Sequence, residues 1–391
     1  MRASGTKTGR RLPVWAWVGI TAAATLTVTL GAMAMLLGRE GLSLVQGWLL
    51  ARYAFVEEDA DLGKAADSAL YGLVEGLGDR WSYYITPENY QSLKDRRANR
   101  YVGIGVTVDY TDERGLCIRE VKAGSPAEQA GVLVGEIITA VDGQSVAGEA
   151  RYNGTSLISG EEGKEQTLTL LDAGGGTRDA VLTLRYIPMP VVTGRLLDNG
   201  MGLVTIRNFN SNADKEFRET VNDLTARGAT ALLFDLRNDG GGYINELTKM
   251  LDFLLPEGDV FRSDPRWGVS SASHSDESCI GLPFGTLVNR DTYSAAELFA
   301  AQLRESLGAP VVGEVTSGKG YSQNTFPLPN GGALGLSTAR YRTGGGVSLI
   351  GVGITPDITL SLDEEQEAKL SAGTLDPSED PQLQALIGLM E

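Results

Sequence analysis

Residues 231–242 read Ala-Leu-Leu-Phe-Asp-Leu-Arg-Asn-Asp-Gly-Gly-Gly, an apolar run that ends in polar residues and three glycines. A short apolar run bounded by turn residues is typical of a strand that is buried on both faces of a sheet. The glycines allow the backbone to turn sharply and to approach a ligand closely. A helix is predicted to follow, from about Ile244 to Leu255. This order of strand, glycine turn and helix favours an α/β domain.

The same alternation continues on both sides of this stretch. Further strands are predicted at 202–206 and 286–289, and further helices at 214–227 and 294–307. The last of these helices is stopped by Gly308, because glycine is the usual residue just past a helix end. We therefore predict an α/β domain over residues 189–360.

Ser294 stands where a predicted strand gives way to a helix that is rich in alanine. A serine at this place is commonly a helix N-cap, and Glu297 three residues later fits a capping role. It can also be a nucleophile on a rigid turn. In that case the N–H of Ala295, at the positive end of the helix dipole, can face a developing oxyanion.

Lys319 stands between two glycines in a loop of the same predicted domain. It is either a solvated loop lysine or a general base. A lysine can accept a proton only when it is neutral, and its ordinary pKa is about 10.4. Burial lowers that pKa, because desolvation favours the neutral amine. Gln323 can accept a hydrogen bond from the amine without adding a negative charge that would raise the lysine pKa again.

Residues 101–188 predict a compact β-rich module. Alternating residues from Val102 to Val108 predict one half-buried strand, and further strands are predicted at 137–141, 166–171 and 181–186. The segment Ser125-Pro-Ala-Glu128 is a capping box with proline at the first helical position. The glycine loop Gly103-Ile104-Gly105-Val106 offers consecutive N–H groups that can hold a terminal carboxylate, beside a strand to which a peptide can add. An ordinary glycine-containing hairpin is the alternative.

This module resembles a PDZ domain, and the whole order of segments resembles the C-terminal processing peptidases of the S41 family. The resemblance covers roughly residues 60–360. Its specific part is Ser-x-x-Glu at Ser294, with the lysine of Gly-Lys-Gly-x-x-Gln 25 positions further on. It implies a multi-domain fold of mixed α/β and β modules, with a ClpP/crotonase-like core in the protease domain.

The same resemblance implies roles for individual residues. Ser294 would be the nucleophile, Lys319 the general base, and Gln323 the group that orients the lysine. The oxyanion would be held by the backbone N–H of Gly241, or of a neighbouring glycine, and of Ala295. Asp239-Gly240 departs from the family's more frequent Asn-Pro, which leaves open the glycine whose N–H points inward.

The N-terminus carries four basic residues and no acidic residue up to residue 13, followed by 24 uncharged residues from Val14 to Leu37. At 1.5 Å per residue a helix of this length spans the ~30 Å hydrocarbon core of a membrane. The upstream positive charge places its start in the cytoplasm. We predict a single-pass anchor in the cell membrane (residues 1–40) with the catalytic domain outside the cytoplasm. A cleaved signal sequence, with cleavage near Ala34, is the alternative.

The remaining segments and the composition complete the prediction. Residues 41–100 predict a helical region, and residues 361–391 an acidic tail with a docking terminal helix. A net charge of −16 without a basic cluster beyond the N-terminus argues against nucleic-acid binding. Two distant cysteines and one histidine indicate no metal site and no cofactor. The expected partners are proteins or peptides with apolar C-termini, and the oligomeric state, including a homo-oligomer, stays open.

Two other functions compete with the Ser/Lys peptidase. The first is a hydrolase in which Ser294 works with His274, the single histidine of the chain, which lies in a polar, loop-like stretch. The second is a membrane-tethered PDZ adaptor with an inactive protease domain. Such an adaptor would not need Ser294, Lys319 and Gln323 together at this spacing.

Overall fold

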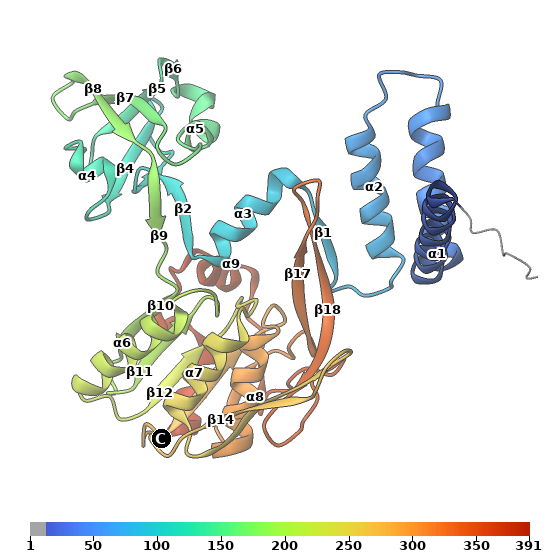
Figure 1. Ribbon diagram of the computed structural model, residues 1–391. Helices are drawn as coiled ribbons and strands as arrows, with labels where there is room; N and C mark the ends of the chain where they lie inside the picture. Colours follow the sequence, from blue (N-terminus) through green and yellow to red (C-terminus); the bar gives the residue numbers. More distant parts are fainter. Residues whose placement is uncertain (1–12) are drawn as a thin grey trace, which may run out of the picture. The chain divides into compact units, whose positions relative to one another are not determined.

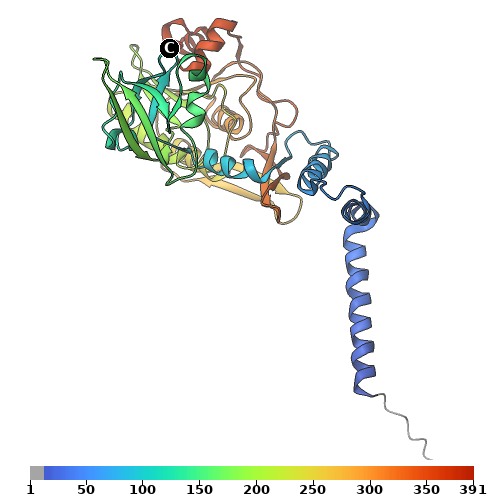
Figure 2. The same cartoon turned by 90° about the horizontal axis from the view of Figure 1, so that it is seen from above.

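The computed structural model describes residues 13–391, and the chain divides into two compact units, Met1–Leu73 and Val74–Glu391. The basic residues on which the orientation of the anchor was predicted lie outside the described residues. Helix α1 (Val14–Ala54) is long and apolar enough to cross a membrane, and none of its residues is buried. It continues past the predicted end at Leu37, and Gly38 (φ 63°, ψ −173°) divides it into two helical stretches that run in different directions (Figure 2). Helix α2 (Leu62–Glu75) follows.

The second unit begins with elements that precede the β-rich module. Strand β1 (Tyr83–Ile85) and helix α3 (Pro87–Arg97) lead into β2 (Arg100–Gly103). Strand β2 pairs with β9 (Arg185–Pro188) as a two-stranded antiparallel ribbon, which connects the module to the rest of the unit. The helical region predicted for residues 41–100 therefore also contains short strands.

The β-rich module is an antiparallel sheet in the order β3-β4-β5-β7-β8, with β6 paired to β5. Its elements are β3 (Val106–Asp109), β4 (Leu116–Val121), α4 (Pro126–Gln129), β5 (Ile137–Val141), β6 (Gln144–Ser145), α5 (Arg151–Leu157), β7 (Glu165–Leu171) and β8 (Thr177–Thr183). A core of its own, which includes Leu116, Ile118 and Leu168, holds the module together.

The single strand predicted from Val102 to Val108 was wrong, because Ile104 and Gly105 separate β2 from β3. Gly105 has φ 81°, and a Cβ atom there would lie 2.4 Å from the Cβ of Ser125. The carbonyl groups of Ile104 and Gly105 accept hydrogen bonds from Ala127 and Lys122 instead of from a strand. The continuous strand predicted at 181–186 is likewise divided between β8 and β9.

A six-stranded sheet forms the centre of the protease domain, in the order β10-β11-β12-β15-β16-β19. Its strands are β10 (Val192–Leu196), β11 (Gly202–Ile206), β12 (Leu232–Asp235), β15 (Phe284–Val288), β16 (Val311–Gly313) and β19 (Ile358–Thr359). Strand β10 is antiparallel to β11, and the other neighbouring pairs are parallel. All four residues of β12 are buried, as the apolar run predicted.

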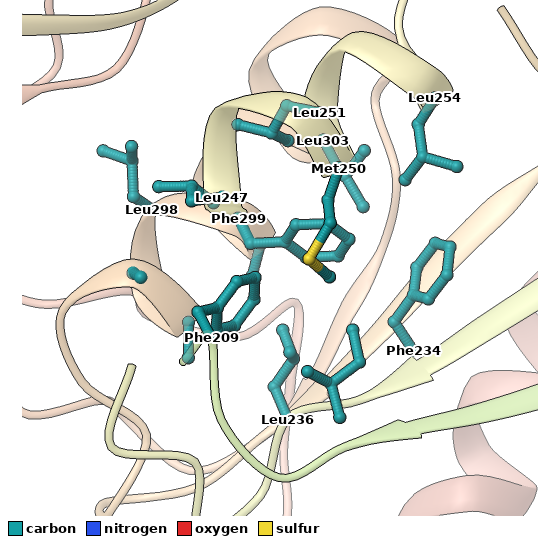
Figure 3. Packing of buried hydrophobic residues seen from close by; sticks show 14 of the residues in the cluster. Phe209, Phe234, Leu236, Leu247, Met250, Leu251, Leu254, Leu298, Phe299 and Leu303 are labelled. Carbon is teal, nitrogen blue, oxygen red and sulfur yellow. The ribbon is translucent and has the colours of Figure 1, made fainter. Parts of the chain in front are cut away.

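Helices α6 (Ala213–Ala226), α7 (Ile244–Leu254) and α8 (Ala295–Leu307) bury their apolar faces against this sheet (Figure 1). Figure 3 shows Phe209, Phe234 and Phe299 meeting below Met250 and Leu247 of α7. The rings of Phe234 and Phe299 meet edge to face with centroids 5.3 Å apart, a favoured aromatic geometry. This core fixes the N-terminal ends of α7 and α8, and the site described below lies at those ends.

A second, five-stranded antiparallel sheet follows the order β1-β18-β13-β14, with β17 also paired to β18. Its further strands are β13 (Gly258–Pro265), β14 (Ser271–Ser275), β17 (Tyr321–Pro327) and β18 (Ala333–Arg342). The acidic tail holds α9 (Glu364–Ala372) and α10 (Pro381–Met390). Leu383 and Leu386 of α10 are buried with residues of the central sheet, so the tail does end in a docked helix.

Candidate active site

A pocket of about 510 Å³ collects the residues that the sequence singled out. Ser294, Ala295, Lys319 and Gln323 all line it, together with the glycine turn 240–242. The turn follows β12, Ser294 precedes α8, Lys319 lies between β16 and β17, and Gln323 lies on β17. The fold thus brings three separate parts of the sequence to one place.

Ser294 stands at a strained point of the backbone. Its φ of 62° is unusual for a residue other than glycine, and such conformations cost of order 1–3 kcal/mol and cluster at functional sites. Its side chain lies near the phenol of Tyr341, which lines the same pocket. Ala295 is the first residue of α8, where a backbone N–H has no acceptor within the helix. The turn therefore presents a hydroxyl group and a helix N-terminus to the same pocket.

Gly241 packs directly against this turn. A Cβ atom at Gly241 would lie 2.7 Å from the backbone nitrogen of Ala295 and 2.8 Å from the Cβ of Ser294, so only glycine fits. Its N–H donates a hydrogen bond of 2.7 Å to Oδ1 of Asp239. In this structure the Gly241 N–H is therefore engaged within the turn rather than free to donate into the pocket. The acceptor is present because this chain has Asp239-Gly240 where the family more often has Asn-Pro, and Asp239 supplies a carboxylate oxygen close to that N–H.

Asp239 itself is fully buried, and within residues 13–391 its Oδ2 has no hydrogen-bond partner. Burial raises the pKa of this carboxyl group well above its ordinary value, and the hydrogen bond from Gly241 opposes the shift only in part. A buried carboxylic acid is less costly in its neutral form than as an unpaired anion.

Lys319 is buried, with 9% of the residue exposed. Its Nζ lies 5.0 Å from the ring centroid of Trp81 and 5.6 Å from that of Tyr293. Burial lowers the pKa of Lys319 to about 8. Glu297 and Asp79 oppose this shift, while the positive charge of Arg97 reinforces it. The amine is therefore deprotonated to a useful extent near neutral pH.

The two glycines around Lys319 are required by close packing. Gly318 has φ 72°, and a Cβ atom at Gly320 would lie 2.2 Å from Cγ1 of Ile350. The carbonyl oxygen of Lys319 accepts a hydrogen bond of 2.7 Å from the hydroxyl group of Tyr341. Tyr341 thus contacts both the serine turn and the lysine loop, and burial raises its pKa, so that it stays neutral.

Glu297 also connects the turn that carries Ser294 with the loop that carries Lys319. Its carboxylate is fully buried and accepts hydrogen bonds from the backbone N–H groups of Ser294 (3.0 Å) and Lys319 (3.0 Å). It also accepts one from the N–H of Gly318 (2.8 Å) and one from the hydroxyl group of Thr316 (2.5 Å). The sequence indicated only a helix-capping role. The structure adds that one carboxylate fixes the position of the lysine loop relative to the serine turn.

Gln323 uses both of its side-chain N–H donors inside the protein. They donate to the carbonyl oxygen of Tyr321 (3.0 Å) and to the hydroxyl group of Ser337 (3.1 Å). The side-chain oxygen Oε1 is the polar atom that remains for the pocket. Gln323 can therefore act there only as an acceptor.

His274 lies away from this arrangement, on β14 of the second sheet. Its side chain is 67% exposed, and its Nδ1 contacts a carboxylate oxygen of Asp259. It is not among the residues that line the pocket. The structure thus gives no support to a pair of Ser294 and His274.

The residues singled out in the β-rich module lie at its edge. Strand β3, which begins at Val106, is the last strand of its sheet, so one of its two edges is unpaired. Gly103, Ile104 and Gly105 form the loop that precedes it, and Ile104 is buried. An unpaired edge next to a glycine loop is the arrangement to which an extended peptide can add.

Comparison with known proteins agrees with this architecture. A family model described as Peptidase family S41 matches residues 200–360, and one described as PDZ domain matches residues 117–171. The chain is 30% identical over 364 residues to the carboxy-terminal processing protease CtpA of Bacillus subtilis, covering 90% of this chain and 78% of that protein. It is 28% identical to the chloroplastic C-terminal processing peptidase of Tetradesmus obliquus, covering 81% and 72%.

A solved structure, a putative S41 protease from Bacteroides fragilis, shares the fold with a TM-score of 0.54 at 16% identity, covering 88% of this chain and 96% of that one. The PDZ module thus precedes the protease domain in the chain, as the resemblance implied. The chain belongs to the S41 family of serine peptidases, and within it to the carboxy-terminal processing peptidases that carry a PDZ domain.

Proposed function

We propose that the chain is a membrane-anchored serine endopeptidase in which Ser294 attacks the scissile carbonyl and Lys319 removes the proton of the serine hydroxyl. One observation carries this proposal. Ser294 and the buried Lys319, whose pKa is lowered to about 8, line the same pocket. A hydroxyl group attacks an amide slowly unless a base takes its proton in the transition state, and a neutral lysine is such a base.

The remaining groups fit the steps of acyl transfer. As Oγ of Ser294 bonds to the substrate carbonyl carbon, its proton passes to Nζ of Lys319. The negative charge that develops on the carbonyl oxygen faces the N–H of Ala295 and the dipole of α8. The lysine ammonium then protonates the leaving amine, and water releases the acyl group from Ser294. Oε1 of Gln323 would accept a hydrogen bond from the lysine and orient it.

The glycine turn supplies the second oxyanion donor in this proposal. The N–H of Gly241 can serve only after its hydrogen bond to Asp239 is broken, so Gly240 or Gly242 is an alternative donor. We further propose that the parallel sheet with its covering helices is a ClpP/crotonase-like core, in which the turn after β12 and the start of α8 form the oxyanion site.

The test compares single variants on one disordered protein substrate. Ser294→Ala and Lys319→Ala should be about equally inactive, because nucleophile and base act as one unit. Lys319→Arg should be inactive as well, since a guanidinium stays protonated. His274→Ala should keep the wild-type rate. An active Lys319→Arg variant beside an inactive His274→Ala variant would overturn the proposal.

The pH profile gives a second test. The protonated lysine cannot act as a base, so kcat/KM should be low below the pKa and rise with pH, with a midpoint near 8. A rate that falls as pH rises through 8 would show that the protonated group is the active form.

We also propose that the PDZ module selects substrates by a free, apolar C-terminus. The glycine loop 103–105 would hold the terminal carboxylate, and the substrate would extend the sheet along β3. Amidating the last residue of a substrate, or making its last residues acidic, should then lower kcat/KM by about tenfold, which corresponds to ~1.4 kcal/mol. Equal cleavage of free and amidated substrates would remove the module from substrate choice.

A further inference from the structure

A segment that lies outside both matched regions packs beside the loop that carries Lys319. Residues 79–85 precede the PDZ module, yet they pack on the protease domain. The guanidinium group of Arg80 donates to the carbonyl oxygen of Ser317 (2.7 Å), two residues before Lys319. The hydroxyl group of Ser82 accepts from the N–H of Ser337 (3.1 Å), and β1 pairs with the first residues of β18.

These contacts place the ring of Trp81 beside the lysine. Its centroid lies 5.0 Å from Nζ of Lys319 and 5.8 Å from the ring centroid of Tyr293. The guanidinium group of Arg80 lies 4.3 Å from the same ring. Trp81 also lines a second, larger cavity of about 930 Å³, whereas Lys319 lines the pocket of Ser294. The indole thus borders the larger cavity and lies next to the amine.

We propose that Trp81 is a positioning residue that closes this side of the Lys319 amine to water, so that the segment before the PDZ module completes the site of the protease domain. This inference rests on the proposed function of Lys319 as the base. It assigns to residues 79–85 a part in catalysis, although they lie more than 200 residues before Ser294 in the sequence.

Two effects of the indole on the amine oppose each other. The face of an aromatic ring attracts a cation, which would stabilise the ammonium form and raise the pKa of Lys319. Exclusion of water favours the neutral amine and lowers that pKa. Burial is the largest cause of the lowered pKa of Lys319, so we expect the second effect to win.

Other charged and titratable groups face the amine from the surrounding elements. They are Glu297 on α8, Tyr293 just before α8, Arg97 on α3, Asp79 before β1, and Tyr341 on β18. Burial opposes ionisation of Asp79, but hydrogen bonds from Ser82 and Ser337 prevail and lower its pKa. Asp79 is therefore an anion and Tyr341 a neutral phenol around pH 8. All five groups are the same in each Trp81 variant, so a change in the pH profile reports on the indole.

The experiment measures kcat/KM from pH 6 to pH 10.5 with the full chain in lipid nanodiscs. Trp81→Ala should move the midpoint upward from about 8 by about one pH unit, which lowers the rate about tenfold at pH 7 and restores it above the new midpoint. Trp81→Phe and Trp81→Leu, which keep an apolar group there, should stay within about half a unit of the wild type. Trp267→Ala is the matched control, because Trp267 is 83% exposed in the loop between β13 and β14.

Three results would overturn the inference. Loss of activity in Trp81→Ala at every pH with an unchanged midpoint would mean a merely structural role. A downward shift would show that the attraction between cation and ring prevails, and equal shifts in Trp267→Ala would show a nonspecific effect. Failure of the base assignment is recognised separately, because Lys319→Ala would then stay active and the wild type would lack the rising limb near pH 8.

Discussion

At the scale of single residues, the site depends on a carboxylate that takes no part in the chemistry. Glu297 accepts four hydrogen bonds, two of them from the backbone of Ser294 and Lys319. A shift of about 1 Å in the relative position of nucleophile and base can cost about a hundredfold in rate. The accuracy of that position therefore depends on whether this side chain can accept hydrogen bonds on both oxygens.

Glu297→Gln should lower kcat about a hundredfold or more, since the amide nitrogen would face N–H donors and one side of the network would be lost. The variant also removes the negative charge that raises the pKa of Lys319, so the midpoint of the pH profile should move downward. Steady-state kinetics across pH 6–10 measures both effects. An upward shift, or wild-type kcat, would contradict this account; Glu305→Gln, on the last turn of the same helix, is the control.

The buried lysine should also cost stability. Its pKa falls from 10.5 to about 8 in the folded chain, which corresponds to about 3 kcal/mol at 1.36 kcal/mol per unit. The unfolded chain binds more protons between these two values, so stability should rise with pH through this window. Lys319→Met should therefore raise the free energy of unfolding by roughly 1–3 kcal/mol at pH 7. Urea denaturation at pH 7 and pH 10 checks this, since the gain should shrink at the higher pH.

The sequence singled out the residues of the proposed site better than their surroundings. Ser294, Lys319 and Gln323 were recognised from the spacing that they share with the S41 family, and the structure brings all three to one pocket. Trp81, Arg97 and Tyr341 were missed, because only long-range folding brings them to the pocket and each stands in an unremarkable local sequence. The hydrogen bond between Gly241 and Asp239 was also missed, although the unusual Asp239-Gly240 was noticed.

At the scale of elements, local sequence patterns predicted the buried strand β12 and the helices α7 and α8, because one apolar run or stripe determines the structure of each element. Such patterns gave a wrong prediction where tertiary contacts interrupt an apparently regular alternation. The residues from Val102 to Val108 alternate like one strand, but the carbonyl groups at Ile104 and Gly105 are satisfied by the segment around α4. Backbone groups that find such partners do not need a neighbouring strand.

Helix α10 belongs to the protease domain rather than to a solvated acidic tail. Asp380 at its start forms a buried ion pair with Arg237, 2.7 Å apart, and Arg237 follows β12 just before the glycine turn. A Cβ atom at Gly285 would lie 2.8 Å from Cδ1 of Leu386, so the absence of a side chain at this position of β15 leaves the space in which Leu386 packs. The helix thus supports the strands from which the glycine turn and the serine turn emerge.

Leu386→Ala should therefore lower the free energy of unfolding by about 2–4 kcal/mol, since it removes a fully buried side chain and leaves a cavity. Leu389→Ala on the same helix should cost less than about 1 kcal/mol, because Leu389 is 45% exposed. Chemical denaturation of both variants measures the difference. Equal losses would mean that α10 is not docked as described.

At the scale of the whole molecule, the chain combines a long apolar helix with an acidic remainder. Helix α1 has no buried residue and is long and apolar enough to cross a membrane, a property that a signal sequence shares. An apolar helix of this size is more stable in a lipid bilayer than in water. The direction of insertion that we predict rests on the basic residues before Val14.

Those basic residues predict that the chain starts in the cytoplasm and that residues 41–391 lie outside it. Protease added to intact spheroplasts should then degrade the catalytic domain and leave an epitope placed at the N-terminus protected. A cytoplasmic marker protein, intact in the same sample, controls for leakage. If α1 is instead a cleaved signal sequence, the same domain should appear in the medium with a new N-terminus near Gly31-Ala-Met-Ala34. Protection of the catalytic domain until the membrane is broken would reverse the orientation and place Ser294 and its substrates in the cytoplasm.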